Sequence, residues 1–366
     1  MFGNLKVLEL ASVLAGPSVG QFFAELGADV IKVENSAGGG DVTRTWKSPD
    51  ENTDDRSAYF SSVNWGKRSL AIDLTSKEGR DVINKLASKT DIVIASYKPG
   101  DDKKLGVSYE QLQEINKNII YGRITGYGPL NDRVGYDAVL QAESGFMSLN
   151  GEENGPPIKM PVALIDVLAG HQLKEGLLIA LLKRERTGEG SFVDVSLIQS
   201  AVASLVNQAS NWLVGNHLPT RKGSLHPNIA PYGEWFETKD GKRLLLAVGT
   251  DRQFKDLCSL LKIDINDRYA KNVDRVKNRK ALGELIANRV SNVSLQEIQS
   301  EINRLKIPAG VIQNMNEVFE MKEARELLLS ADGLKGVRSF VAGHTAKALS
   351  PPPHLGQHNK EILNKL

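Results

Sequence analysis

The sequence of 366 residues contains a single cysteine, Cys258. One thiol can form neither an intramolecular disulfide nor a metal site built from several thiolates. The surrounding run DRQFKDLCSLL has helical spacing, and we interpret Cys258 as a buried structural residue. The sequence also lacks a recognisable leader at its start, since residues 5–10 already form a strand-like run. These absences favour a cytoplasmic location.

Long apolar runs and an excess of one charge are lacking too. No stretch approaches the roughly 18 apolar residues of a membrane span, so we expect no membrane association. Lys and Arg number 46 and Asp and Glu number 44, a net charge of +2. Because a dedicated nucleic-acid binder has a marked basic excess, no nucleic-acid partner is expected. The apolar fraction of 41% and the charged fraction of 25% exclude a wholly disordered chain.

Several familiar catalytic motifs are missing. The turn at residues 12–17 follows the first strand but has no G-x-G-x-x-G pattern, which disfavours a nicotinamide or flavin dinucleotide. The sequence has no phosphate-binding G-x-x-x-x-G-K-[ST] loop, no G-x-S-x-G elbow and no H-E-x-x-H pair. We therefore expect no metal and no tightly bound cofactor.

The pattern that is present predicts an α/β fold. Residues 5–10 and 29–34 read as strands on either side of a helix, which is a βαβ unit with parallel strands. Strand-like runs at 69–74, 91–95 and 119–125 alternate with helical patterns, so the first 130 residues resemble a doubly wound sheet. A second α/β region begins near Trp235, with a hairpin signal at 239–242.

Asp166 stands out as a charge among aliphatic residues at the start of a helical run. One interpretation is an N-terminal helix cap, a position where aspartate satisfies orphan N–H groups. The other interpretation is a nucleophile or base. The two are compatible, because a helix N-terminus stabilises a nearby anion.

Asp166 and its flanks, together with motifs spread over the whole chain, resemble the family III CoA-transferases. This family includes formyl-CoA transferase, the carnitine CoA-transferases and the 2-methylacyl-CoA racemases. The matching motifs, in chain order, are LGADVIKVE at 26–34, GDVTR at 40–44, NWGKRS at 64–69, GYD at 135–137, GLLIALLKRERTGEG at 176–190, VDVSL at 193–197, GTDRQF at 249–254, IPAG at 307–310 and PPHLGQH at 352–358.

The resemblance implies a two-domain chain that interlocks with a second copy to form a homodimer. The large domain is Rossmann-like, binds CoA and corresponds here to residues 1–200 with 320–366. The smaller α/β domain corresponds to residues 215–319. Long linkers near 200–232 and 305–325 join the two domains.

The resemblance also implies a mechanism, in which the family's aspartate falls on Asp166. Its carboxylate attacks the donor acyl-CoA to form a mixed anhydride, and the CoA thiolate then makes an aspartyl-CoA thioester. A carboxylic acid acceptor finally takes over the CoA. Coenzyme A is thus a substrate, carried as acyl-CoA, and Asp166 provides covalent catalysis.

Carried over position by position, the family's CoA site falls on the loops that follow the strands. It comprises Leu14, Ala15, Asn35, Ile72, Asp73, Leu74, Thr75, Ser96, Tyr97, Lys98, Lys104, Gly135, Tyr136 and Asp137. Formyl-CoA transferase has glutamine at the position of Leu14 and arginine at that of Asn35. We expect Lys67, Arg68, Lys98 and Lys104 to be partners for the CoA phosphates.

The alternative within the family is a 2-methylacyl-CoA racemase. Racemases of the family use a histidine in a Gly-His-Asp motif, where this sequence has Tyr136. A tyrosine with a pKa of about 10 is a poor proton shuttle near neutrality, which favours a transferase. Arg44 or Arg133 could read a second carboxylate, so a dicarboxylate such as succinate is a candidate substrate.

Overall fold

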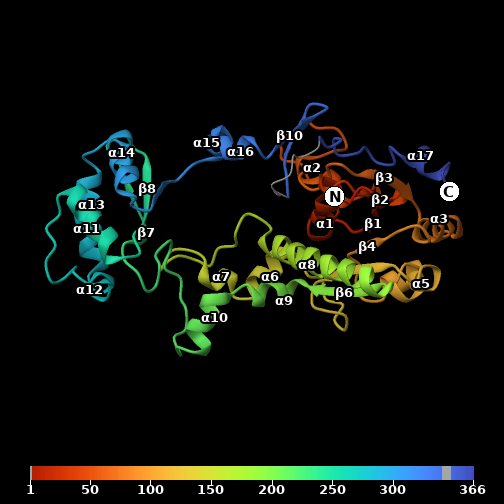
Figure 1. The fold of residues 1–366 in the computed structure, drawn as a ribbon, viewed down its shortest axis with the longest axis horizontal. Helices are drawn as coiled ribbons and strands as arrows, with labels where there is room; N and C mark the ends of the chain where they lie inside the picture. Colours follow the sequence, from red (N-terminus) through yellow and green to blue (C-terminus); the bar gives the residue numbers. More distant parts are fainter. Residues whose placement is uncertain (1, 340–347) are drawn as a thin grey trace. The chain divides into compact units, whose positions relative to one another are not determined.

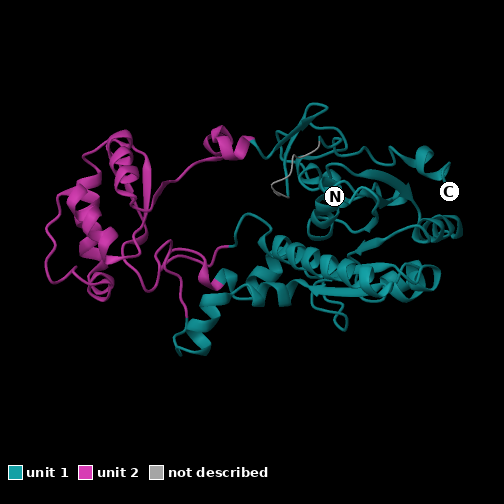
Figure 2. Ribbon diagram, in the orientation of Figure 1, with its two compact units in different colours: residues 1–147, 159–218, 326–366 teal, residues 148–158, 219–325 magenta. Residues whose placement is uncertain are grey.

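The computed structural model describes residues 2–339 and 348–366. The chain divides into two compact units (Figure 2). Unit 1 comprises residues 1–147, 159–218 and 326–366, and unit 2 comprises residues 148–158 and 219–325. None of the described helices combines the length and the apolar character that a bilayer crossing needs.

Unit 1 is built on a sheet of six parallel strands (Figure 1). The strands are β1 Lys6–Leu10, β2 Asp29–Asn35, β3 Arg68–Ile72, β4 Ile92–Ala95, β5 Ile120–Thr125 and β6 Ser191–Ser196. Their order is β3-β2-β1-β4-β5-β6, the order of doubly wound sheets. The register places Val7 of β1 between Val30 of β2 and Ile92 of β4. The predicted α/β class with a parallel sheet is confirmed.

Helices pack on both faces of this sheet. The helices of unit 1 are α1 Ala15–Glu25, α2 Ala58–Ser61, α3 Lys77–Ala87, α4 Asp101–Leu105, α5 Tyr109–Ile115, α6 Asp137–Glu143, α8 Leu164–Thr187, α9 Leu197–Ala203, α10 Val206–Leu213 and α17 Asn359–Leu363, with α7 Phe146–Leu149 at the boundary between the units. Two 3-10 turns, η1 Ser36–Gly38 and η2 Val42–Thr45, follow β2, and a hairpin of β10 Leu328–Ala331 and β11 Leu334–Val337 lies near the end of the chain.

The two faces of the sheet have separate cores because side chains alternate along each strand. Helices α1 and α8 share one core with residues such as Val7 and Ile94. Helices α3, α5 and α17 share the other with residues such as Leu8 and Val93. The helical segment that follows β6 is interrupted between α9 and α10.

The absence of a side chain at Gly170 allows α8 to pack closely against α1. A Cβ atom at this position would lie 2.6 Å from Ser18 Oγ and 3.2 Å from the carbonyl oxygen of Ala15. Only glycine therefore permits this close approach. Asp166 lies one helical turn before Gly170, so the contact brings the first turn of α8 next to the first turn of α1.

Unit 2 contains a three-stranded antiparallel sheet with helices packed around it. Its elements are β7 Tyr232–Glu237, β8 Arg243–Ala247, β9 Ala309–Val311, α11 Asp251–Leu261, α12 Asn272–Lys277, α13 Arg279–Val290, α14 Leu295–Leu305, α15 Met315–Glu320 and α16 Lys322–Arg325. The predicted hairpin joins β7 to β8, closed by a hydrogen bond of 2.8 Å from Thr238 N–H to the Lys242 carbonyl. Cys258 lies in this core, 2% exposed, and burial raises the pKa of its thiol to about 11. Its predicted structural role is confirmed.

Candidate active site

A cavity of about 260 Å³ opens at the carboxyl edge of the six-stranded sheet. It is lined by the loops after β1, β4 and β5 and by the first turns of the four helices α1, α6, α8 and α9. The lining residues are Ser12, Val13, Leu14, Ala15, Gly16, Val42, Ser96, Tyr97, Lys98, Pro99, Ile124, Thr125, Gly126, Asn131, Arg133, Val134, Gly135, Tyr136, Asp137, Asp166 and Leu197. Strands β1 and β4 are neighbours at the point where the strand order reverses, which is where open α/β sheets bind ligands.

Asp166 is the third residue of α8 and is 7% exposed. The expectation that it caps this helix is wrong. Ala163 occupies the N-cap position, and no side chain of that residue or of Asp166 caps the helix. The Asp137 carboxylate, from α6, accepts the Ile165 N–H at 2.7 Å instead. Because a remote aspartate satisfies this helix end, the carboxylate of Asp166 is left available for chemistry.

The electrostatic surroundings of Asp166 favour its protonated form more than water does. Burial, and then the nearby charge of Asp137, raise the pKa of Asp166 from 3.8 to about 7. Within the described part of the chain, no cation forms an ion pair with this carboxylate. A carboxylate with a pKa near neutrality is a stronger nucleophile and base than an ordinary aspartate.

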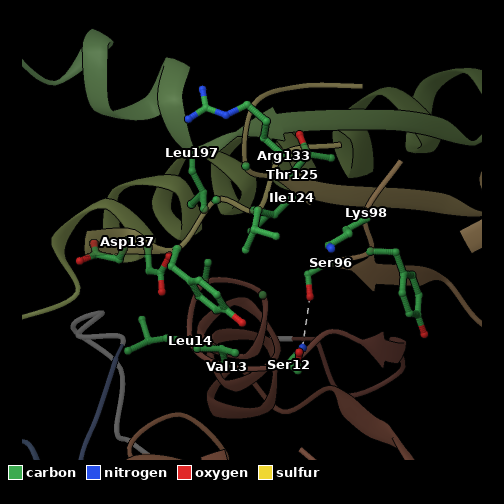
Figure 3. Close-up of a pocket in the computed structure, with 18 of the residues that line it drawn as sticks. Ser12, Val13, Leu14, Ser96, Lys98, Ile124, Thr125, Arg133, Asp137 and Leu197 are labelled. Carbon is green, nitrogen blue, oxygen red and sulfur yellow. Dashed lines mark hydrogen bonds between the residues drawn. The ribbon is translucent and has the colours of Figure 1, made fainter. Parts of the chain in front are cut away.

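The loop after β1 forms the wall beside Asp166. Val13 adopts a φ of 71°, in the left-handed region that valine rarely occupies. Leu14 is the N-cap residue of α1 and offers no side-chain cap, so the N–H groups of the first two residues of α1 remain available to a ligand. Ser12 N–H donates to Ser96 Oγ at 3.2 Å, which ties this loop to the loop after β4 (Figure 3).

Two cationic side chains line the cavity. Lys98 is exposed and directs its ammonium group toward the space above Ser96 (Figure 3). Arg133 lies on the other side, where it forms an ion pair of 2.6 Å with Glu143 and stacks over Tyr127 at 4.3 Å. Its side chain is 55% exposed, so its guanidinium can still meet a ligand.

The structure brings together a large part of the predicted CoA site. Leu14, Ala15, Ser96, Tyr97, Lys98, Gly135, Tyr136 and Asp137 line the same cavity as Asp166. Asn35, Ile72, Asp73, Leu74, Thr75 and Lys104 do not line it. Asn35 and Ile72 end β2 and β3, so Asn35 and residues 72–75 follow two neighbouring strands along the same edge of the sheet. Lys104 is exposed in α4 and pairs with Asp101 at 2.8 Å.

Three expected ligand-binding cations are engaged elsewhere, and these expectations are wrong. The ammonium of Lys67 is fully buried and pairs with Glu9 at 2.7 Å. Arg68 begins β3 at the opposite edge of the sheet, where it binds Asp29 at 2.5 Å. Arg44 is 3% exposed and its guanidinium binds Glu34 through two nitrogens, at 2.7 and 2.8 Å. None of the three lines the cavity.

Asp41 and Asn131 are polar residues that sequence reasoning did not assign to the site. Asn131 lines the cavity, and Asp41 lies behind the wall formed by Val13. The GDVTR motif was the sequence signal for Asp41, because the Val13 N–H that it accepts lies 28 positions earlier, in the loop after β1.

The doubly wound fold and a buried acid in a cavity at its switch point define an α/β enzyme. The sequence profile of CoA-transferase family III matches residues 3–359. A succinate–glutarate CoA-transferase of Agrobacterium fabrum is 38% identical, with 99% of this chain and 95% of that protein covered. A human succinyl-CoA:glutarate CoA-transferase is 35% identical, with 99% and 85% covered. A crystal structure of a CAIB/BAIF family protein from Brucella suis superimposes with a TM-score of 0.88 at 38% identity, covering 99% of this chain and 98% of that one.

The chain therefore belongs to CoA-transferase family III, a family of enzymes that transfer coenzyme A. This confirms the resemblance inferred from the motifs.

Proposed function

We propose that this enzyme moves CoA from an acyl-CoA donor to a carboxylic acid through covalent intermediates on Asp166. The observation that carries the proposal is a nearly buried carboxylate, with a pKa of about 7 and no cation partner among the described residues, that lines the cavity at the switch point of the sheet. Burial strengthens the nucleophile because it removes water that would otherwise solvate the charge.

The proposed reaction consumes no water and no cofactor. The Asp166 carboxylate attacks the thioester carbonyl, and the CoA thiolate leaves to give a mixed anhydride. The thiolate then attacks the aspartyl carbonyl, which releases the donor acid and leaves an aspartyl-CoA thioester. The acceptor carboxylate attacks this thioester, the C–S bond breaks, and the CoA thiolate leaves to give a second anhydride. Attack of the thiolate on its acyl carbon yields the new acyl-CoA and restores Asp166.

The start of α1 suits the charge that develops in these steps. Each attack on a carbonyl creates an oxyanion, and the first-turn N–H groups of α1 lie at the same cavity without a side-chain cap. The positive end of a helix dipole stabilises such an anion. CoA itself is proposed to lie along the carboxyl edge of the sheet, over the cavity residues Leu14, Ala15, Ser96–Lys98 and 135–137 and outward over Asn35, Ile72–Thr75 and Lys104.

Trapping the intermediate tests the proposal. After incubation with an acyl-CoA donor, hydroxylamine should convert Asp166 to a hydroxamate and borohydride should reduce its thioester, both visible by mass spectrometry of that peptide. Asp166→Asn should fold and carry no label. Full activity in the Asn variant, or a label on a different residue, would remove Asp166 from the mechanism.

We further propose dicarboxylates as substrates, with succinyl-CoA as a donor and glutarate or a related acid as an acceptor. The names of the Agrobacterium and human relatives support this choice. Arg133 is the candidate for the distal carboxylate, because it lines the cavity and its partner Glu143 is a carboxylate that a substrate could replace.

The test compares Arg133→Gln with Arg123→Gln. Arg123 also pairs with a carboxylate, Asp194 at 2.9 Å, and stacks over an aromatic ring, but it does not line the cavity. Loss of Arg133 should raise KM for dicarboxylates at least about tenfold and leave monocarboxylates little changed, since a charge-assisted pair contributes about 1.5–3 kcal/mol. Equal effects in the two variants would refute the assignment.

Racemase activity is the second candidate. Tyr136 is 57% exposed at the cavity where racemases of the family have histidine, and the described cavity lining contains no histidine. A racemase exchanges the α-hydrogen of a 2-methylacyl-CoA with solvent. We expect no α-deuterium incorporation in deuterated water at a catalytic rate, and fast wash-in that depends on Asp166 would favour the racemase.

We propose, finally, that two copies interlock as a homodimer, with a large domain of residues 1–200 and 320–366, a small domain of residues 215–319 and linkers near 200–232 and 305–325. Helix α10 supports a partner: within it and just after it, Val206, Leu213 and Val214 are 68%, 74% and 82% exposed. An interlocked pair separates only if one subunit partly unfolds. Rapid exchange of subunits between two differently tagged preparations under native conditions would contradict the interlocked homodimer.

A further inference from the structure

Val13 is held in a conformation that its own side chain opposes. Its φ of 71° lies in the left-handed region, where a β-branched residue is crowded by its own backbone. Such a residue keeps this conformation only when its surroundings impose it. Val13 is the last residue before Leu14, the N-cap of α1, so its backbone sets the direction in which α1 begins.

The backbone N–H of Val13 is bound by the side chain of Asp41. Both carboxylate oxygens of Asp41 accept the Val13 N–H, each at 3.3 Å. The Asp41 side chain is only 1% exposed, and the Thr43 N–H and hydroxyl fix one of its oxygens at 3.0 and 2.8 Å. A carboxylate held in this way offers the Val13 N–H a single, fixed acceptor.

Lys32 keeps Asp41 charged and in place. Its ammonium is fully buried, lies 2.9 Å from Asp41 and 3.0 Å from Glu9, and donates to the Ala11 carbonyl at 2.8 Å. The ammonium of Lys32 therefore contacts both Asp41, which accepts the Val13 N–H, and the loop that contains Val13. Burial alone would raise the pKa of Asp41, but the charge and hydrogen bond of Lys32 lower it, so Asp41 is ionised at neutral pH.

Glu9 extends this buried network beneath α1. Its second oxygen pairs with Lys67 at 2.7 Å, and Lys67 donates to the Pro17 carbonyl in α1 at 2.8 Å. A Cβ atom at Gly20 would lie 1.7 Å from Glu9 Oε2, so glycine is required where α1 crosses the network. The same cluster of charges thus contacts the loop before α1 and the first turn of α1.

We propose that Asp41 is a positioning residue, which holds Val13 in the left-handed conformation and so aims the first N–H groups of α1 at the carbonyl that Asp166 attacks. The inference rests on the proposed function of Asp166. Asp41 itself does not line the cavity, so it acts through the backbone of Val13 and Leu14.

A double-mutant cycle with Val13→Gly tests this role, because glycine adopts a φ of about 70° without crowding. In the Val13 background, Asp41→Asn should lower kcat about tenfold and change KM for acyl-CoA less than about threefold. In the Val13→Gly background, the same substitution should lower kcat by less than about threefold. The same loss of kcat in both backgrounds would overturn the proposal.

Asp91→Asn provides the matched control. Asp91 also accepts a backbone N–H, that of Lys6 at the start of β1, at 2.9 Å, and also pairs with a cation, Arg184 at 3.0 Å, but at the other end of the strand from Val13. Its substitution should leave kcat within about twofold in both backgrounds. A tenfold loss there would mean that any loosening of β1 impairs turnover, which would overturn the specific role of Asp41.

Hydrogen exchange of the wild-type protein tests the contact between Asp41 and Val13 without any variant that has to fold. The Val13 amide, resolved by fragmentation of its peptide, should exchange at least about a hundredfold more slowly than in the unfolded chain. Exchange at the unfolded rate would refute the contact. Failure of the proposed function can be distinguished from failure of this inference. If Asp166 is not the covalent residue, it will stay unlabelled when the wild type is incubated with an acyl-CoA donor, whatever the hydrogen-exchange rate of the Val13 amide.

Discussion

Asp166 should lower the stability of the folded enzyme at high pH, and Asp166→Asn should remove this effect. The pKa of its carboxyl is about 7 in the folded protein and 3.8 in its ordinary state. Between these values the folded protein retains a proton that the unfolded chain has released. The free energy of unfolding therefore falls as the pH rises through this interval and levels off above pH 7.

The magnitude follows from the interval itself. At 1.36 kcal/mol for each pH unit, the stretch from pH 5 to pH 7 lowers the stability of the wild type by about 3 kcal/mol relative to the Asn variant. For a domain of about 250 residues, 1 kcal/mol moves Tm by about 2–4 °C, so the advantage in Tm of the variant should grow by roughly 6 °C or more between pH 5 and pH 8.5.

Scanning calorimetry of both proteins at the two pH values measures this difference directly. All other titrating groups are shared, so their contributions cancel in the comparison. An advantage of the Asn variant that is the same at pH 5 and pH 8.5 would show that Asp166 ionises with an ordinary pKa. The account of its activation by burial would then be wrong.

Three further outcomes are expected. The rate of Asp166 labelling by an acyl-CoA donor should rise with pH up to about 7 and then level, because the nucleophile is the ionised form; a flat profile from pH 5 to 8 would contradict the pKa of about 7. Gly170→Ala should lower kcat, because the new Cβ would lie 2.6 Å from Ser18 Oγ and push α8 off α1; the addition of Ser18→Ala should restore part of the loss. Glu9→Gln should cost about 3–5 kcal/mol in the free energy of unfolding, since it leaves two buried lysines without their shared carboxylate. Asp101→Asn, at an exposed pair, should change the free energy of unfolding far less, and equal costs in a denaturation assay would refute the contrast.

The parts of the fold that depend on local pattern could be predicted from the sequence. The first five strands of the large sheet are short apolar runs separated by helical patterns, and each of these five was expected within a few residues of its position. The turn at 239–242 was equally readable, because Asp-Gly between two strand-like runs is a local hairpin signal. Asp166 was identifiable because a charge within an aliphatic run is locally conspicuous.

The partners of the charged residues could not be predicted in the same way. Lys67, Arg68 and Arg44 all suggested anion binding, yet each is engaged by an acid that is distant in sequence or on another strand. The same limit applies to Asp166 as a helix cap. Its residue type favours capping, but the tertiary fold brings Asp137 from 29 positions earlier in the sequence to the helix end.

This exchange of aspartates links the stability of the site to its chemistry. If Asp166 capped α8, its carboxylate would accept backbone N–H groups, its pKa would fall and its nucleophilicity would fall with it. Asp137 takes over the bond to Ile165 and at the same time places a negative charge that raises the pKa of Asp166. The use of a distant aspartate in place of a local one therefore satisfies the helix end, leaves the Asp166 carboxylate uncommitted and raises its pKa. The expected cost is the loss of stability above pH 5 that Asp166→Asn should recover.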